Sequence, residues 1–139
     1  MTNSSLGRAY LEKAQKRLPV LDLLHEEKAY SDVVREAQEV VELALKGALR
    51  LVGVEPPKLH DVGPVLLEHA DRFPPDVRAQ LPELARISKW LRKEREFSFY
   101  GEADFIPTLE YTEEDADRAR GDARRVVSVC RQLLPPGSS

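Results

Sequence analysis

The sequence has a single cysteine, Cys130, among its 139 residues. One thiol cannot form an internal disulfide, and it cannot supply a cysteine-rich zinc site. No apolar run approaches the roughly 20 residues that a membrane-spanning helix needs. Residues 1–10 also lack the apolar core of a signal peptide. These absences favour a cytoplasmic protein that does not enter a membrane.

The chain also lacks an excess of positive charge, since its formal net charge at pH 7 is −3. This balance argues against a protein that coats nucleic acid without preference, but it is compatible with a local basic groove. A chain of 139 residues fits one domain. We expect a single domain over residues 1–139, with a core from about residue 6 to 134 and a flexible tail at 135–139.

The strongest periodic pattern starts at Ser31 and stops before Gly53. Its apolar residues recur with the period of an amphipathic helix that buries one continuous stripe. They are Val33, Val34, Ala37, Val40, Val41, Ala44, Leu45, Ala48, Leu49 and Val52. Ser31 is the expected N-cap, and Gly53 is the expected residue just past the C-terminus. This segment is predicted to be the central helix.

Other segments also have a helical period, and no strand-like alternation occurs. They predict helices over about 5–26, 61–70 and 82–98 and from Thr112 onward, a helical turn at 76–80 and an irregular connection at 99–111. Pro19 is expected to kink the first helix without breaking it. Thr112 and Asp115 resemble a capping box. The predicted fold class is all-α: an antiparallel four-helix up-and-down bundle with one additional short helix.

An ordered series of residues surrounds the central helix. A tyrosine precedes it, then come an alanine, a glutamate, a lysine and a leucine, a Gly-x-x-Pro loop and a His-Asp pair. These are Tyr30, Ala37, Glu42, Lys46, Leu49, Gly53, Pro56, His60 and Asp61. The series resembles the HEPN domain (higher eukaryotes and prokaryotes nucleotide-binding), over about residues 6–134. The resemblance implies an antiparallel helical bundle, often dimeric, with an RNA- or nucleotide-related function.

Many HEPN proteins are metal-independent ribonucleases. The resemblance implies a motif near the end of the penultimate long helix: an arginine followed, after four to six residues, by a histidine. Arg95 matches the arginine, but Tyr100 stands where the histidine is expected, and no histidine occurs beyond His69. A guanidinium stabilises phosphate charge well. A tyrosine, with an ordinary pKa near 10, is a poor general base at neutral pH.

Both motif positions also have a structural interpretation. Arg95 continues the row formed by Leu84, Ile87, Ser88 and Leu91 at helical spacing, so it could be a buried arginine paired with a carboxylate or with backbone carbonyls. Tyr100 could anchor the loop that follows through its ring and hydroxyl. These interpretations and a ligand-contacting role stay open together.

The three histidines do not predict a metal site. His25 and His69 lack partner ligands three or four residues further along the chain, so neither a metal nor a cofactor is expected. His60 is expected to bridge its loop to the following helix beside Asp61, and it is retained as a possible ligand contact. Cys130 lies on the apolar stripe of the last helix and is expected in the core.

Basic residues gather on the last two long helices. They are Arg86, Lys89, Arg92 and Lys93 on one, and Arg118, Arg120, Arg124, Arg125 and Arg131 on the other. Acidic residues interrupt both runs, which is typical of solvated faces. If the two helices are neighbours, their arginines could instead line a phosphate-binding groove beside Arg95.

The leading hypothesis is a HEPN-like homodimer that binds RNA or nucleotide. The resemblance alone implies a partner, such as a minimal nucleotidyltransferase in a toxin–antitoxin pair. The candidate ligand-binding residues are Arg95, Arg92, Tyr100, Lys46 and His60. One alternative is a divergent metal-independent ribonuclease that uses Arg95 and Tyr100, so enzymatic activity is left open. The other is a helical protein-interaction module without a nucleotide role.

Overall fold

The structure, a computed structural model, describes residues 2–58, 61–100 and 111–135, with the backbone alone for 94–100. Within these ranges every regular element is a helix. The elements are α1 (Asn3–Glu26), α2 (Tyr30–Leu51), α3 (Val62–Glu68), a 3-10 turn (Ala70–Arg72), α4 (Pro75–Arg78), α5 (Leu81–Tyr100) and α7 (Glu113–Arg131). None of the described helices is long and apolar enough to cross a membrane. The all-α prediction is confirmed.

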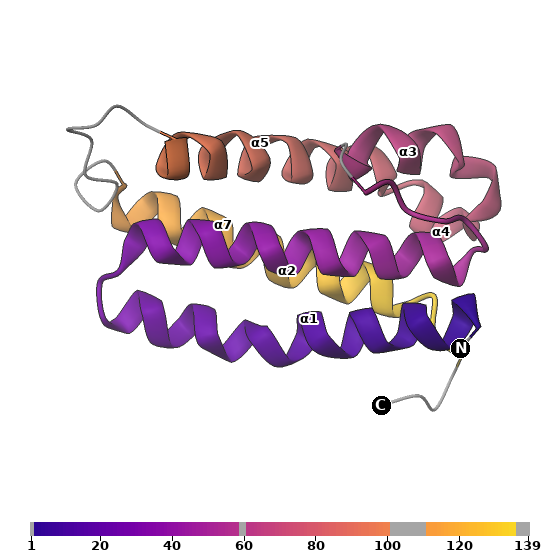
Figure 1. The fold of residues 1–139 in the computed structure, drawn as a ribbon, viewed down its shortest axis with the longest axis horizontal. Helices are drawn as coiled ribbons and strands as arrows, with labels where there is room; N and C mark the ends of the chain where they lie inside the picture. Colours follow the sequence, from indigo (N-terminus) through magenta and orange to yellow (C-terminus); the bar gives the residue numbers. More distant parts are fainter. Residues whose placement is uncertain (1, 59–60, 101–110, 136–139) are drawn as a thin grey trace.

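The four long helices run alternately in opposite directions, as Figure 1 shows, with α3 and α4 grouped at the end where α2 leads into α5. The helix α2 is central because it packs against α1, α5 and α7. Its predicted apolar stripe from Val33 to Leu49 is buried throughout. The core is therefore built on the helix with the strongest periodic pattern.

The ends of α2 were predicted with mixed success. Gly53 follows the C-cap residue Val52 with a φ of +83°, so its left-handed backbone ends the helix as expected. The prediction of Ser31 as N-cap is wrong. The backbone N–H of Val33 already donates to the carbonyl of Ala29 at 3.0 Å, so the helix begins at Tyr30 and Ser31 lies inside it, only 6% exposed.

The helix α1 is continuous through Pro19, as predicted, while the kink there stays a prediction. It packs closely against α2 where two glycines meet. A Cβ atom placed on Gly47 would lie 2.9 Å from the carbonyl oxygen of Gly7. One placed on Gly7 would lie 2.8 Å from the carbonyl oxygen of Gly47. Only residues without a side chain permit this approach between the two backbones.

The last helix begins as predicted. Thr112 Oγ1 accepts from the backbone N–H of Asp115 at 3.2 Å, and Asp115 Oδ2 accepts from the N–H of Thr112 at 3.0 Å. The connection predicted at 99–111 needs a correction, because α5 continues to Tyr100. Residues 101–110, and the tail at 136–139, lie outside the described residues.

Candidate functional site

The helix α5 carries both motif positions, Arg95 and Tyr100, on its last turns. Their side chains lie outside the described part of the structure, as does the whole of His60. Leu84, Ile87 and Leu91 on the same helix are fully buried or nearly so. By register, Arg95 is the next position of this row towards the C-terminus of α5.

Asp61 fixes the start of α5's neighbour, α3, and ties it to α5. Its Oδ1 accepts from the backbone N–H of Gly63 at 3.1 Å, which caps α3. The same oxygen accepts from the hydroxyl of Ser88 at 2.9 Å. Ser88 is one of three buried polar residues among those described, and this bond satisfies it. The aspartate of the His-Asp pair therefore has a structural role.

A second set of contacts holds α5 against α7. The indole Nε1 of Trp90 donates to Oδ2 of Asp122 at 2.9 Å. The guanidinium carbon of Arg118 lies 4.1 Å from the centre of the Trp90 ring, a cation–π distance. Arg125 pairs with Glu83 at 2.9 Å. The two helices are neighbours, as the groove hypothesis requires.

Most arginines of α7, however, face carboxylates of this chain. Arg120 pairs with Asp22 at 3.2 Å and with Asp117 at 3.3 Å. Arg124 also pairs with Asp22, and Arg131 donates to the side chain of Gln15. Their charge is thus largely balanced internally, so a basic groove would depend on α5 more than on α7.

The outer side of α5 presents exposed cations at Arg86, Lys89 and Lys93, while Arg92 is half-buried. Beside Arg86 and Lys89 lies a shallow hollow of about 270 Å³ between α3 and α5. It is lined by Asp61, Pro64, Leu67, Pro82, Ala85, Arg86 and Lys89. The hollow is at the N-terminal half of α5, so it is separate from the turns that carry Arg95 and Tyr100.

Lys46, another predicted ligand contact, lies on α2 with a carboxylate partner. Its Nζ is 3.3 Å from Oε1 of Glu42, and the lysine side chain is 25% exposed. Oε2 of the same glutamate accepts from the side-chain amide of Gln38 at 3.0 Å. In the described structure Lys46 and Glu42, both part of the family series, therefore form a local pair on one helix face.

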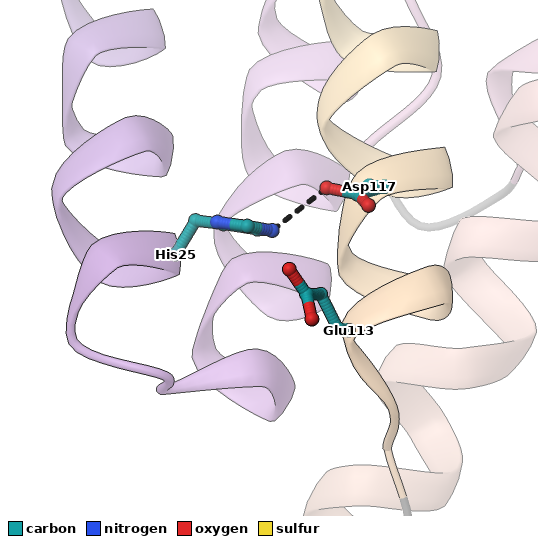
Figure 2. A group of neighbouring side chains, drawn as sticks. All are labelled: His25, Glu113 and Asp117. Atoms are coloured by element: carbon teal, nitrogen blue, oxygen red, sulfur yellow. Dashed lines mark ion pairs between the residues drawn. The ribbon is translucent and has the colours of Figure 1, made fainter.

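The structure brings together three residues that the sequence did not connect: His25 on α1, and Glu113 and Asp117 on α7 (Figure 2). Nε2 of His25 lies 2.7 Å from Oδ1 of Asp117. Spacing along the chain after His25 gave no sign of this cluster, because the histidine comes from α1 and both carboxylates come from α7. The only available signal was topological: in an up-and-down bundle the end of the first helix and the start of the last lie at the same end.

Two remaining predictions concern His69 and Cys130. Nδ1 of His69 lies 3.2 Å from the carbonyl oxygen of Val65, a contact within one helical turn. Cys130 is buried, as predicted. Burial raises the pKa of its thiol to about 12, so it stays protonated at neutral pH and is a core residue rather than a nucleophile.

The structure is an antiparallel helical bundle, and its motif arginine lies near the end of the penultimate long helix. These are the features that the resemblance to HEPN domains implied. The chain belongs to the HEPN domain family, whose model matches residues 8–133. A Methanocaldococcus jannaschii protein described as "Putative toxin MJ1304" is 26% identical to this chain, in an alignment that covers 95% of this chain and 90% of that protein.

The fold also has a solved counterpart in TT1696 from Thermus thermophilus. Its crystal structure superposes with a TM-score of 0.72 at 22% identity, covering 92% of this chain and 98% of the other. At this level of identity the comparison establishes the arrangement of helices only. It agrees with the predicted antiparallel bundle.

Proposed function

We propose that this HEPN protein binds RNA or nucleotide near the C-terminal end of α5 and acts in a toxin–antitoxin pair. The observation that carries the proposal is family membership over residues 8–133, together with the similarity to a protein described as a "Putative toxin". The motif arginine, Arg95, is present on the helix where the family motif places it.

The contacts around α5 support this location. Asp61 holds one side of the helix through Ser88, and Asp122 holds another side through Trp90. These two contacts fix the part of α5 that directly precedes its last two turns. Exposed Lys89 and Lys93 supply positive charge on the turns just before Arg95, which favours a phosphate-bearing ligand.

The test measures binding of a fluorescently labelled single-stranded RNA, and separately of ATP, by purified variants. Arg95→Ala should weaken binding about 10- to 100-fold, the value of one or two charge-assisted hydrogen bonds. Arg95→Lys should recover little, because an ammonium cannot reproduce the planar, two-pronged donation of a guanidinium. Thermal melts establish that each variant is folded.

Arg17→Ala is the matched control. It removes the same charge from α1, where Arg17 pairs with Glu36 at 2.9 Å, and it should leave RNA affinity nearly unchanged. Unchanged affinity of folded Arg95→Ala would contradict the proposed site. If Arg95→Ala lowers thermal stability and leaves RNA affinity unchanged, this arginine has a structural role in the bundle.

The ribonuclease alternative is tested at Tyr100. If its hydroxyl takes part in cleavage, Tyr100→Phe should abolish metal-independent turnover and retain RNA binding. If the tyrosine only packs, the same variant should behave like the wild type. Tyr100→His completes the family motif, and new cleavage activity in EDTA would show that α5 retains a ribonuclease geometry.

The proposal includes a homodimer and a protein partner. Val20 and Leu23 are exposed large apolar residues that share one face of α1 by their spacing of three, and a second subunit on this face would bury them. Sedimentation at micromolar concentration should therefore give a dimer, and a monomer alone would contradict it. A minimal nucleotidyltransferase encoded beside this gene should copurify with the chain, whereas copurification of neither RNA nor such a partner would favour the interaction-module alternative.

A further inference from the structure

The cluster of His25, Glu113 and Asp117 has the composition of a metal site. It offers one imidazole nitrogen and two carboxylate oxygens, and these ligand atoms all lie within 4.8 Å of one another. In a tetrahedral zinc site, bonds near 2.1 Å place ligand atoms about 3.4 Å apart. Small rotations of exposed carboxylate side chains would reach that spacing. Glu113 and Asp117 are one helical turn apart, so both project to the same side of α7.

The imidazole of His25 is directed into this cluster and is mostly buried. The side chain is 16% exposed, and the Nε2 atom is buried without a hydrogen-bond partner among the described residues. Nε2 lies 2.7 Å from Oδ1 of Asp117, but the two groups are not aligned as a hydrogen bond requires. The ring of Tyr30 lies 5.7 Å away, at a tilt of 59°. A buried imidazole nitrogen without an aligned partner needs an explanation.

The surrounding charges allow a cation here. Asp117 shares its Oδ1 with Arg120 at 3.3 Å, but Arg120 is also engaged by Asp22 at 3.2 Å. Asp22 also binds Arg124. Arg120 and Arg124 therefore both pair with Asp22, which lies outside the cluster. The C-terminal end of α1, where His25 lies, favours positive charge, while the N-terminal end of α7 disfavours it. The two helix ends therefore have opposite effects on a bound cation. The local electrostatic potential is then set mainly by the two carboxylates of the cluster, which attract a cation.

We propose that His25, Glu113 and Asp117 bind a single divalent transition-metal ion, of the class represented by Zn²⁺ and Co²⁺. An imidazole combined with carboxylates suits these ions better than Mg²⁺ or Ca²⁺, which take oxygen ligands. Three protein ligands leave a coordination position for water. The ion would join the end of α1 to the start of α7. The proposal is independent of RNA binding at α5, and its test does not involve RNA.

The experiment titrates metal-free, full-length protein with Co²⁺ and records the visible d–d absorption, then displaces Co²⁺ with Zn²⁺. We expect saturation at one ion per chain and a rise in melting temperature, because an ion that binds only the folded state stabilises it. His25→Ala and Glu113→Gln should each weaken Zn²⁺ binding at least about tenfold, since even loss of an outer-shell partner costs 10- to 100-fold.

The controls separate this site from other surface groups and from misfolding. His69→Ala removes a histidine at the C-terminal end of α3, in contact with Val65, and should bind Zn²⁺ like the wild type. Glu113 is exposed, so Glu113→Gln should fold normally even if His25→Ala does not. Absence of saturable Co²⁺ absorption, or wild-type Zn²⁺ affinity in Glu113→Gln, would overturn the proposal. Equal losses in His69→Ala would also overturn it.

Discussion

Trp90 donates its indole N–H to Oδ2 of Asp122 at 2.9 Å, and this bond links the helix of the proposed site to α7. Arg118 completes the contact, since its guanidinium carbon lies 4.1 Å from the ring centre and its Nε lies 3.9 Å from the same aspartate oxygen. One carboxylate therefore positions both an aromatic ring and the cation above it. The last two turns of α5, with Arg95 and Tyr100, follow directly after this anchor.

Removing the acceptor at position 122 should loosen α5. Asp122→Ala should lower the free energy of unfolding by about 1.5–3 kcal/mol, the range for a hydrogen bond to a charged group. Trp90 is the single tryptophan, so its fluorescence reports the local change without interference. Asp122→Asn keeps an oxygen acceptor and should recover most of the loss. Equal losses in both variants would mean that the pair with Arg118 matters more than the bond to Trp90.

Two adjacent residues of the central helix, Leu45 and Lys46, provide a simple test of which helix face is buried. Leu45 is fully buried, so Leu45→Ala should cost about 2–5 kcal/mol through lost burial and a residual cavity. Lys46 has 25% of its side chain exposed and a partner within one turn, so Lys46→Ala should cost well under half as much. Denaturant melts measure both values. Similar losses would contradict the assigned buried face of α2.

The two glycines at the α1–α2 contact should not tolerate a methyl group. In Gly47→Ala the new Cβ would lie 2.9 Å from the carbonyl oxygen of Gly7, and a backbone atom cannot move aside cheaply. Overpacking of this kind costs about 1–3 kcal/mol. Gly121→Ala is the control on α7, where nothing lies within 4 Å of the added Cβ. It should stabilise the protein by about 0.5–1 kcal/mol through helix propensity, as thermal or chemical unfolding can show.

The buried thiol predicts a pH dependence above neutrality. Burial raises the pKa of Cys130 to about 12, above the ordinary thiol value of about 8.5. The folded state therefore retains a proton that the unfolded state releases. Stability linked to this group is fully present below about pH 8.5 and is lost as pH rises towards 12, by up to about 1.4 kcal/mol per unit.

The measurement compares urea melts of wild type and Cys130→Ala between pH 7 and pH 10. Other titrating groups contribute equally to both proteins, so the difference isolates the thiol. Ellman's reagent should also react with the folded wild type far more slowly than with the unfolded chain. Rapid labelling of folded protein at pH 8 would contradict the burial of this side chain.

Periodicity predicted most of the fold because burial decides helical structure in a small bundle. The stripe of α2, the Gly53 stop and the Thr112–Asp115 capping box all follow from local rules and are confirmed. Ser31 failed as an N-cap for a physical reason. A serine is a good cap only where the chain is still non-helical, and here the helical hydrogen bonds already start at the carbonyl of Ala29.

Contacts between distant helices were harder to predict. Gly7 and Gly47 carry no apolar signal, so their close approach appears only when α1 and α2 are placed side by side. The His25 cluster likewise depends on the end of α1 meeting the start of α7. For the candidate site, the sequence supplied the identity of Arg95 and Tyr100 through a family motif. Their roles depend on side-chain geometry, which a motif cannot provide.

The central position of α2 has a consequence for the order in which the chain folds. Its contacts with α1 are local, because only residues 27–29 separate the two helices, whereas its contacts with α7 require closure of a much longer loop. Local contacts cost less chain entropy and form first. We therefore expect the α1–α2 hairpin to be the folding nucleus and α7 to dock late. Substitutions at Gly47 should slow folding, while truncations of buried α7 residues such as Val127 should mainly accelerate unfolding.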